Sequence, residues 1–196
     1  GCHNAIKELY KSLNNTKICY IVDADIKGFF DHMKHEWIIK FLHLYIKDPN
    51  IIGLVKKYLK VGVLDDGKLM LNEEGSAQGN IISPILANIY MHNVLTLWYK
   101  FIITKECKGD NFLIVYADDF VAGFQYKWEA ENYYKLLKER MEKFGLQLEN
   151  SKSRLLQSGA YIARAKQKNG ESIRLQTFDF LGFTFYCGRS RKGMPY

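Results

Sequence analysis

The chain has 196 residues, of which 47% are hydrophobic and 14% aromatic, which is enough to bury a core and excludes an intrinsically disordered protein. Lys and Arg outnumber Asp and Glu by 28 to 21, and the net charge of +7 favours a polyanionic partner such as nucleic acid. The four cysteines lie far apart and form no CxxC pair, so the sequence indicates neither a zinc site nor a disulfide framework.

The first half of the chain mixes amphipathic helical patterns with short β-rich runs. The elements predicted there, in chain order, are a helix over His3–Leu13, a buried strand over Lys17–Ala24, helices over His35–Tyr45 and Pro49–Leu59, and a hairpin of Val61–Leu64 with Lys68–Leu71.

The second half continues the mixture without a regular strand–helix–strand alternation. The elements predicted there are a helix from Ser83 to about Ile103, two strands around Asp118-Asp119, a helix over Lys127–Phe144, strands over Leu146–Glu149 and Arg154–Gln157, a hairpin of Tyr161–Lys166 with Ser172–Gln176, and a last strand over Phe178–Tyr186. The pattern as a whole predicts an α+β fold.

Two acidic clusters follow apolar runs. Asp118 and Asp119 sit where two apolar strands meet, and Asp23 and Asp25 fall on one face of an earlier strand because side chains alternate with period 2. Carboxylate charges next to buried apolar strands cost free energy unless a cation is bound beside them. If the two strands are neighbours, their carboxylates would bridge two Mg²⁺ ions about 3.5–4 Å apart. Taken alone, each cluster is equally well a surface turn or a helix cap.

The order of five motifs points to a family. DADIKGFFD, SAQGNIISP, YADD, the lysine after GLQLENS, and FDFLGF follow one another along nearly the whole chain. In this order they resemble the reverse transcriptases, and most closely the proteins encoded by bacterial group II introns, the intron maturases. The resemblance implies a right-hand polymerase palm, an antiparallel sheet backed by helices, with part of the fingers.

The resemblance also implies roles for the acidic residues. Asp25 matches the first catalytic aspartate, and the backbone carbonyl of Ile26 would be a second ligand of the same metal. Asp118 matches the second main ligand, and Asp119 matches its less direct partner. Asp23 precedes the matched position and is not expected to be a primary ligand. The implied cofactor is a pair of Mg²⁺ ions, for which Mn²⁺ would substitute.

Four further matches concern the nucleotide and the primer. Phe30 matches the bulky residue that excludes a ribose 2′-hydroxyl, although either it or Phe29 is expected to be ordinary core. Gln78-Gly79 matches the motif that packs on the incoming nucleotide and template, and Lys152 matches the lysine that approaches the triphosphate. Phe180-Leu181-Gly182 matches the hairpin that grips the primer end.

The resemblance divides the chain into parts of a polymerase. Residues 1–16 and 32–76 are expected in the fingers, 17–31 and 77–187 in the palm, and 188–196 at the start of a connection to a thumb. The first fingers strands and the thumb would lie outside the chain, so we expect the chain alone to polymerise weakly or not at all.

The last part of the chain is strongly basic. Between Ala160 and Tyr196 there are seven Lys and Arg against two Asp and Glu, and aromatic residues are interleaved with them. Cations with aromatics are typical of a groove that follows a nucleic-acid backbone. The residues expected to bind RNA are Arg164, Lys166, Lys168, Arg189, Arg191 and Lys192.

The implied function is RNA-directed DNA polymerase of a group II intron maturase, with intron RNA, an RNA template, a DNA primer and dNTPs as partners. A non-catalytic RNA-binding splicing cofactor and a retron-type reverse transcriptase are the alternatives. The apolar run Ile81–Leu97 is broken by polar residues, so no membrane association is expected. The expected location is the bacterial cytoplasm, at the nucleoid during insertion, and exposed sheet edges would allow a homodimer.

Overall fold

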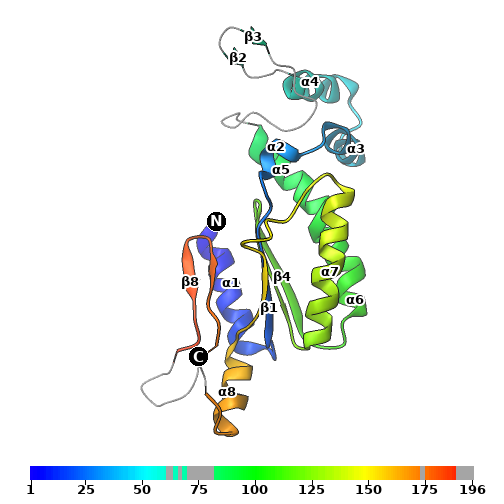
Figure 1. Ribbon diagram of the computed structural model, residues 1–196. Coiled ribbons are helices and arrows are strands. Elements are labelled where there is room, and N and C mark those ends of the chain that lie inside the picture. The colour runs from blue at the N-terminus through cyan, green and yellow to red at the C-terminus, as the bar shows by residue number, and fades with distance from the viewer. Residues whose placement is uncertain (61–63, 66–67, 70–81, 173–174, 189–196) are drawn as a thin grey trace.

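Four antiparallel strands form the centre of the computed structural model, which describes residues 1–60, 64–65, 68–69, 82–172 and 175–188 (Figure 1). In spatial order they are β4 (Asn111–Tyr116), β5 (Asp119–Phe124), β1 (Tyr20–Ala24) and β6 (Arg154–Gln157). In the register of the sheet, Asp23 lies opposite Val121 on one side and opposite Arg154 on the other. The sheet therefore joins segments from the beginning, middle and end of the chain.

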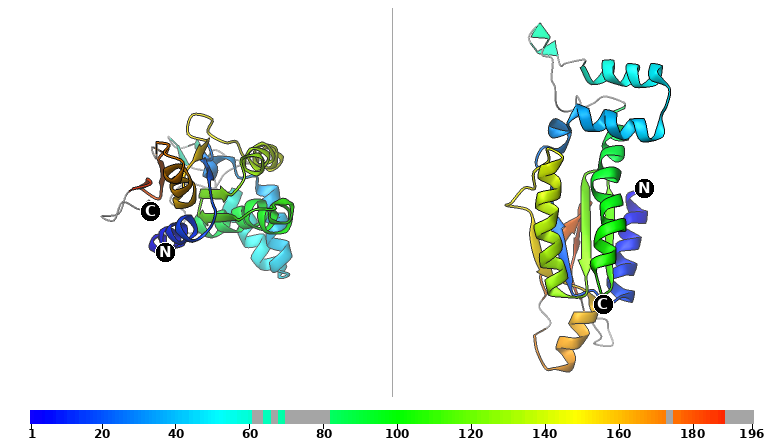
Figure 2. Two further views of the ribbon diagram at one scale, coloured as in Figure 1. Left: turned by 90° about the horizontal axis from the view of Figure 1, so that it is seen from below. Right: turned by 90° about the vertical axis from the view of Figure 1, so that its right-hand side faces the viewer.

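Each face of the sheet is covered by different elements (Figures 1 and 2). One face packs against α7 (Lys127–Lys143) and a continuous helical run of α5 (Ser83–Met91), the π-helical segments η1 (His92–Thr96) and η2 (Tyr99–Ile103), and α6 (Thr104–Glu106). The other face packs against α1 (Cys2–Asn15) and the hairpin of β7 (Phe178–Phe180) and β8 (Phe183–Phe185). This arrangement confirms the predicted α+β class and the predicted long helix after Ser83.

Period-2 alternation divides the strands between two hydrophobic cores. Val22 and Ala122 belong to the core under the helical face, whereas Ile21 and Val121 belong to the core under α1 and the β7–β8 hairpin. A strand that is apolar on both faces is buried on both, which explains why KICYIVDA reads as a nearly continuous apolar run. Asp23 continues the row of Ile21, so it lies on the face shared with α1 and the hairpin.

The remaining elements extend beyond the two ends of the sheet (Figure 1). At one end lie α2 (Phe29–His32), α3 (His35–Tyr45), α4 (Pro49–Lys60) and the paired segments β2 (Leu64–Asp65) and β3 (Lys68–Leu69), and at the other lies α8 (Ala160–Lys168). The predicted helices over His35–Tyr45 and Pro49–Leu59 are confirmed. The centre of the predicted hairpin is confirmed as well, and its outer residues lie outside the described part of the chain.

The predicted strand over Tyr161–Lys166 is wrong, because this segment is helix α8. Asn169-Gly170 resembles a hairpin turn, but here it ends a helix. Gly170 has φ +72°, its N–H donates to the Gln167 carbonyl, and the N–H of Glu171 donates to the Lys166 carbonyl. These are the two hydrogen bonds of a Schellman motif, for which a left-handed glycine is the usual residue.

Two other strand predictions need correction. Leu146–Glu149 is not a strand and keeps only an isolated bridge between Leu148 and Ile26. The predicted strand over Phe178–Tyr186 is instead the β7–β8 hairpin, because Leu181 and Gly182 both have positive φ, as a type I′ turn requires. Helix α2 was not predicted; it begins after Gly28, whose φ of +52° turns the chain out of β1.

Within the part of the chain that the structure describes, no helix combines the length and the apolar character needed to cross a membrane.

Gly123 is required at the centre of β5. It lies opposite Phe112, and an added Cβ would come 2.2 Å from that ring. Phe112 packs against the second core, which is the core under α1 and the β7–β8 hairpin. We therefore expect Gly123→Ala to destabilise the fold by about 1–3 kcal/mol. Gly53→Ala in α4 is the control: its Cβ would meet no atom within 4 Å, and it should stabilise by about 0.5–1 kcal/mol. Urea unfolding measures the free energy of unfolding of both variants. A change of the same sign in both would contradict this account.

Candidate active site

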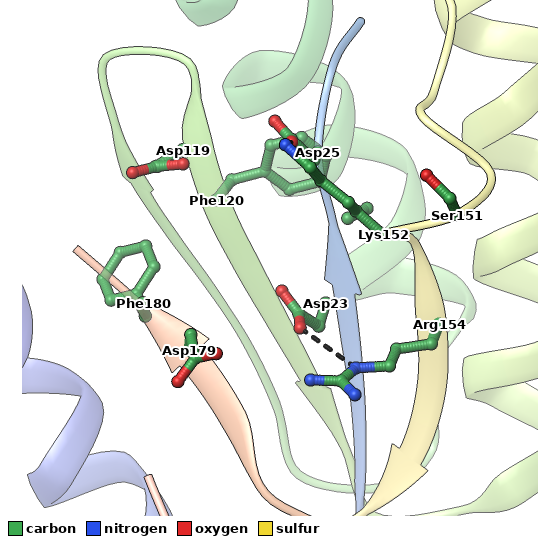
Figure 3. Close-up of a pocket in the computed structure, with 10 residues that line it drawn as sticks. Asp23, Asp25, Asp119, Phe120, Ser151, Lys152, Arg154, Asp179 and Phe180 are labelled. Carbon is green, nitrogen blue, oxygen red and sulfur yellow. Dashed lines mark hydrogen bonds and ion pairs between the residues drawn. The ribbon is translucent and has the colours of Figure 1, made fainter. Parts of the chain in front are cut away.

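A cleft of about 360 Å³ opens where β1 ends and β5 begins (Figure 3). Its polar lining comes from four separate segments of the chain. These are Asp23 and Asp25 from β1 and its end, Asp119 from β5, Ser151, Lys152 and Arg154 from the turn into β6, and Asp179 from β7. The apolar side chains of Phe120 and Phe180 complete the wall.

The cleft is acidic although the chain as a whole is basic. Four carboxylates line it against two cations. Burial raises the pKa of Asp23 to about 6, despite the opposing effect of Arg154. Burial also raises the pKa of Asp119, and the charges of Asp118 and Asp25 raise it further. Crowding of carboxylates of this kind is relieved by a bound cation.

Lys152 forms an ion pair with Asp25. Its Nζ lies 3.1 Å from Asp25 Oδ2, and this contact raises the pKa of Lys152. The turn that carries Lys152 is closed by Glu149, whose carbonyl accepts hydrogen bonds from the N–H groups of Lys152 and Ser153. The side chain of Glu149 accepts two more, from the N–H and the hydroxyl of Ser151. The structure therefore places Lys152 in the lining of the cleft beside Asp25, and its predicted role toward the triphosphate stays a prediction.

The backbone around Asp25 is held by neighbours on the β6 side. The N–H of Asp25 donates to the buried Ser153 hydroxyl at 3.3 Å, and the carbonyl of Asp25 accepts from the N–H of Glu149 at 2.8 Å. The N–H of Lys27 donates to the Gln147 carbonyl. Because the polar groups of successive residues point to opposite sides in an antiparallel pair, the carbonyl of Ile26 is directed toward β5. It is therefore on the side where the second acidic pair lies.

The turn between β4 and β5 carries that second pair. Tyr116 lies opposite Asp119, so Ala117 and Asp118 form a two-residue connection. Ala117 has φ +56°, which costs a non-glycine residue about 1–2 kcal/mol and is therefore a strained conformation. Asp119 lines the cleft, whereas Asp118 is half-buried in the turn and is not among the lining residues. The ranking of Asp118 as the more direct metal ligand stays a prediction.

The two phenylalanines of α2 have different surroundings. Phe29 is 2% exposed and belongs to the core under the helical face, where it contacts Tyr90 edge to face. Phe30 is only half-buried and packs against Phe29 with ring centroids 5.3 Å apart. Phe29 is thus the core residue of the pair. Phe30 is the more exposed one, it is not among the residues that line the cleft, and its contact with the nucleotide sugar stays a prediction.

The β7–β8 hairpin forms the wall of the cleft opposite β6 (Figure 3). Phe180 is buried in the second core and also lines the cleft, while Leu181 and Gly182 form the turn beyond it. Asp179 accepts a hydrogen bond from the Thr184 hydroxyl at 2.5 Å across the two strands. The predicted primer-contacting segment is therefore a hairpin anchored by an aromatic side chain in the core.

Other predicted site residues lie elsewhere. Arg164, Lys166 and Lys168 are on α8, at the end of the sheet away from α2 (Figure 1). Gln78, Gly79, Arg189, Arg191 and Lys192 lie outside the described residues. Sequence reasoning missed Ser153, Arg154 and Asp179. The only available signal for Arg154 was its position two residues after Lys152, which puts both cations on one side of the same extended segment.

The residues present fit a hard divalent cation. Among the described residues, no three Asp, Glu, His or Cys side chains gather closely enough to enclose an ion by themselves. Mg²⁺ does not need such a cage, since it is usually held by one or two carboxylates together with substrate phosphates. Asp25 and Asp119 on one cleft, with the Ile26 carbonyl directed toward β5, are donors of this type.

Comparison with curated proteins gives partial matches. The chain is 36% identical over 110 residues to the group II intron-encoded protein LtrA of Lactococcus lactis, which covers 56% of this chain and 17% of that protein. It is 38% identical over 95 residues to an uncharacterized 91 kDa protein in the cob intron of Schizosaccharomyces pombe, covering 48% of this chain and 11% of the relative. The chain thus spans less than a fifth of the length of these relatives.

Comparison with solved structures confirms the fold. The apo telomerase of Candida tropicalis, truncated from its C-terminal domain, superposes with a TM-score of 0.63 at 18% identity, covering 94% of this chain and 36% of that one. Residues 3–185 match the family described as reverse transcriptase (RNA-dependent DNA polymerase). Because the match spans the sheet, the acidic cleft and the β7–β8 hairpin, the chain belongs to the reverse transcriptase family.

Proposed function

We propose that this chain is the nucleotidyl-transfer region of an RNA-directed DNA polymerase encoded by a group II intron. The observation that carries the proposal is the acidic cleft in which Asp25, paired with Lys152, shares one lining with Asp119. The family match supports the reaction class, and the likeness to LtrA supports the intron class. A retron-type enzyme is the alternative assignment within the same family.

In the proposed reaction, the 3′-hydroxyl of a DNA primer attacks the α-phosphate of a dNTP, an O–P bond forms, and pyrophosphate leaves. Two divalent cations, Mg²⁺ or Mn²⁺, would lower the pKa of the attacking hydroxyl and neutralise the triphosphate. Asp25, the Ile26 carbonyl and Asp118 would hold them, with Asp119 in support. Lys152 would hold a proton beside the leaving pyrophosphate, and its pairing with Asp25 keeps it at that end of the cleft.

Domain limits, partners and location are part of the proposal. Residues 17–31 and 77–187 would be the palm, and 1–16 and 32–76 would be part of the fingers. Gln78 and Gly79 would pack on the nucleotide and template, and Phe180, Leu181 and Gly182 would contact the primer. The protein would act in the bacterial cytoplasm, at the nucleoid during insertion, with intron RNA as a partner, and its exposed sheet edges would allow a homodimer.

The direct test is extension of a DNA primer annealed to an RNA template by the full-length protein. Incorporation of dNTPs that requires Mg²⁺ or Mn²⁺ and stops on chelation is the expected result. The isolated 196-residue chain should extend the same primer far more slowly. If the protein binds the primer–template duplex specifically but incorporates no dNTP at any metal concentration, the polymerase assignment is wrong and a non-catalytic splicing cofactor is favoured.

RNA binding by α8 is a second candidate function, supported by the placement of its side chains. Tyr161, Arg164 and Lys168 recur at i, i+3 and i+7 and are all exposed, so one helical face presents an aromatic and two cations. Replacing Arg164, Lys166 and Lys168 by Gln should lower RNA affinity and flatten its dependence on salt, because each lost phosphate contact reduces the slope by about 1. Filter binding across a salt series measures the slope, and an unchanged slope would make this face ordinary solvated surface.

A further inference from the structure

Two ion pairs join β1 and the residue that follows it to the segment that enters β6. Figure 3 marks the pair between Asp23 and Arg154. Lys152 pairs with Asp25, and Arg154 pairs with Asp23 at 3.5 Å between Nε and Oδ2. Both acids and both cations line the same cleft. Asp23 lies two residues before Asp25, and Arg154 lies two residues after Lys152. Two residues of an extended strand span about 7 Å, so the Arg154–Asp23 pair lies about that far from the Lys152–Asp25 pair.

Arg154 uses only part of its hydrogen-bonding capacity in this pair. Its Nε donates to Asp23, and among the described residues neither Nη atom makes a hydrogen bond or ion pair. The Arg154 side chain is 52% exposed, whereas that of Asp23 is only 20% exposed. Asp23 is thus the more covered member of the pair, and the exposed guanidinium keeps two Nη groups that form no hydrogen bond or ion pair with the described residues.

A planar guanidinium with free Nη groups binds phosphate oxygens in a bidentate manner. The wall opposite Arg154 is β7, from which Asp179 and Phe180 face the same cleft. In the proposed reaction this wall would contact the primer, so the strand between the two walls is the primer near its 3′ end. Its phosphodiesters are the anions that would pass Arg154.

We propose that Arg154, held in place by Asp23, is a binding site for one phosphodiester near the 3′ end of the primer, a step that rests on the function proposed above. Asp23 acts as a positioning residue. It holds the guanidinium at the Asp23 end of the cleft and so keeps this cation from pairing with Asp25 or Asp119, where it would compete with a bound metal.

The test combines side-chain and backbone substitution in the full-length protein. Primers carrying a single neutral methylphosphonate, moved one linkage at a time through the last six, are annealed to an RNA template. Binding is measured by fluorescence anisotropy without dNTPs, and single-nucleotide extension is measured in parallel. With the wild type, one linkage should weaken binding about tenfold, which corresponds to the loss of one charge-assisted contact.

Arg154→Gln should weaken binding of the unmodified primer by a similar factor. In this variant a methylphosphonate at that one linkage should cause no further loss of binding, while methylphosphonates at the other linkages should have the same effect as in the wild type. Arg154→Lys should restore part of the affinity. Asp23→Asn should lower primer affinity less than Arg154→Gln does. The double variant should bind the primer as weakly as Arg154→Gln alone. Lys127→Gln removes a cation whose partner is Glu131 on α7, away from the cleft, and should reproduce the wild-type profile.

The outcomes separate the two proposals. A linkage profile that is the same in the wild type and in Arg154→Gln overturns the phosphodiester site, whatever the variant does to extension. Binding with the expected profile but without any incorporation overturns the polymerase function and supports the site. Equal weakening of Arg154→Gln at every linkage would mean a general electrostatic effect and would also overturn the assigned contact.

Discussion

Asp25→Asn is expected to reduce cDNA synthesis by the full-length protein about 1000-fold or more, equivalent to about 4 kcal/mol of lost transition-state stabilisation. The reason is that Asp25 combines two roles in one place. It supplies an anionic oxygen to the acidic cleft, and it holds Lys152 at 3.1 Å. The asparagine amide keeps the shape of the side chain and removes the charge, so both the proposed metal ligand and the ion pair are lost.

The same substitution should leave the fold intact. Asp25 is partly exposed, and its charge raises the pKa of Asp119, so removing that charge relieves repulsion within the cleft. The thermal midpoint should therefore be unchanged or higher. The control is Asp48→Asn at the start of α4, where Asp48 accepts a hydrogen bond from the Asn50 N–H and asparagine can do the same. Steady-state primer extension and thermal unfolding on both variants give the comparison.

The double variant Asp25→Asn with Asp118→Asn separates polymerase from splicing. If the RNA contacts lie outside the cleft, as the position of α8 suggests, splicing assistance should survive while cDNA synthesis disappears. Loss of both activities in a protein that still folds would contradict separable roles. Retention of substantial cDNA synthesis by either aspartate variant would remove these carboxylates from the reaction.

Three residues that line the cleft could be named from the sequence because the order of the five motifs resembles the reverse transcriptases, whereas each acidic cluster alone is equally well a surface turn or a helix cap. Asp25, Asp119 and Lys152 are far apart in the chain, but each belongs to a run whose local form the sequence indicates: the end of an apolar strand, a hairpin tip, a turn before a strand. The antiparallel register then brings the three together, with Ala24 opposite Phe120 and Asp23 opposite Arg154. The α+β class follows from the same local patterns.

What could not be predicted depends on contacts between distant segments. Asn169-Gly170 is compatible with a hairpin or a helix end. In the structure it ends α8, and this helix buries Ala160 and Ala163 in the interior. The Arg154–Asp23 pair joins residues 131 positions apart, and nothing in either local sequence indicates it. The difference between Phe29 and Phe30 likewise depends on Tyr90, which contacts the first ring from another helix.

Phe30→Ala is expected to raise incorporation of rNTPs relative to dNTPs by about 10–100-fold. Steric exclusion of one hydroxyl by a side chain corresponds to a few kcal/mol, and truncation to alanine removes the whole ring. The ring of Phe30 is half-buried and contacts Phe29 edge to face, so its neighbour on one side is a ring that is packed in the core. A side chain that excludes a 2′-hydroxyl by steric contact needs an exposed edge and a packed neighbour behind it. Phe30 would provide the exposed edge, and Phe29 would be the packed neighbour.

Phe29→Leu is the matched comparison, because it changes the packed neighbour and leaves Phe30 in place. It should lower the free energy of unfolding, since Phe29 is fully packed, while the folded protein keeps most of its preference for dNTPs. Phe30→Ala should do the opposite, with a small loss of stability and a large loss of sugar discrimination. Competition between each dNTP and its rNTP, measured as the ratio of kcat/KM values, distinguishes the two. If both variants change the ratio equally, discrimination comes from the shape of the whole α2 segment, and Phe30 has no individual role.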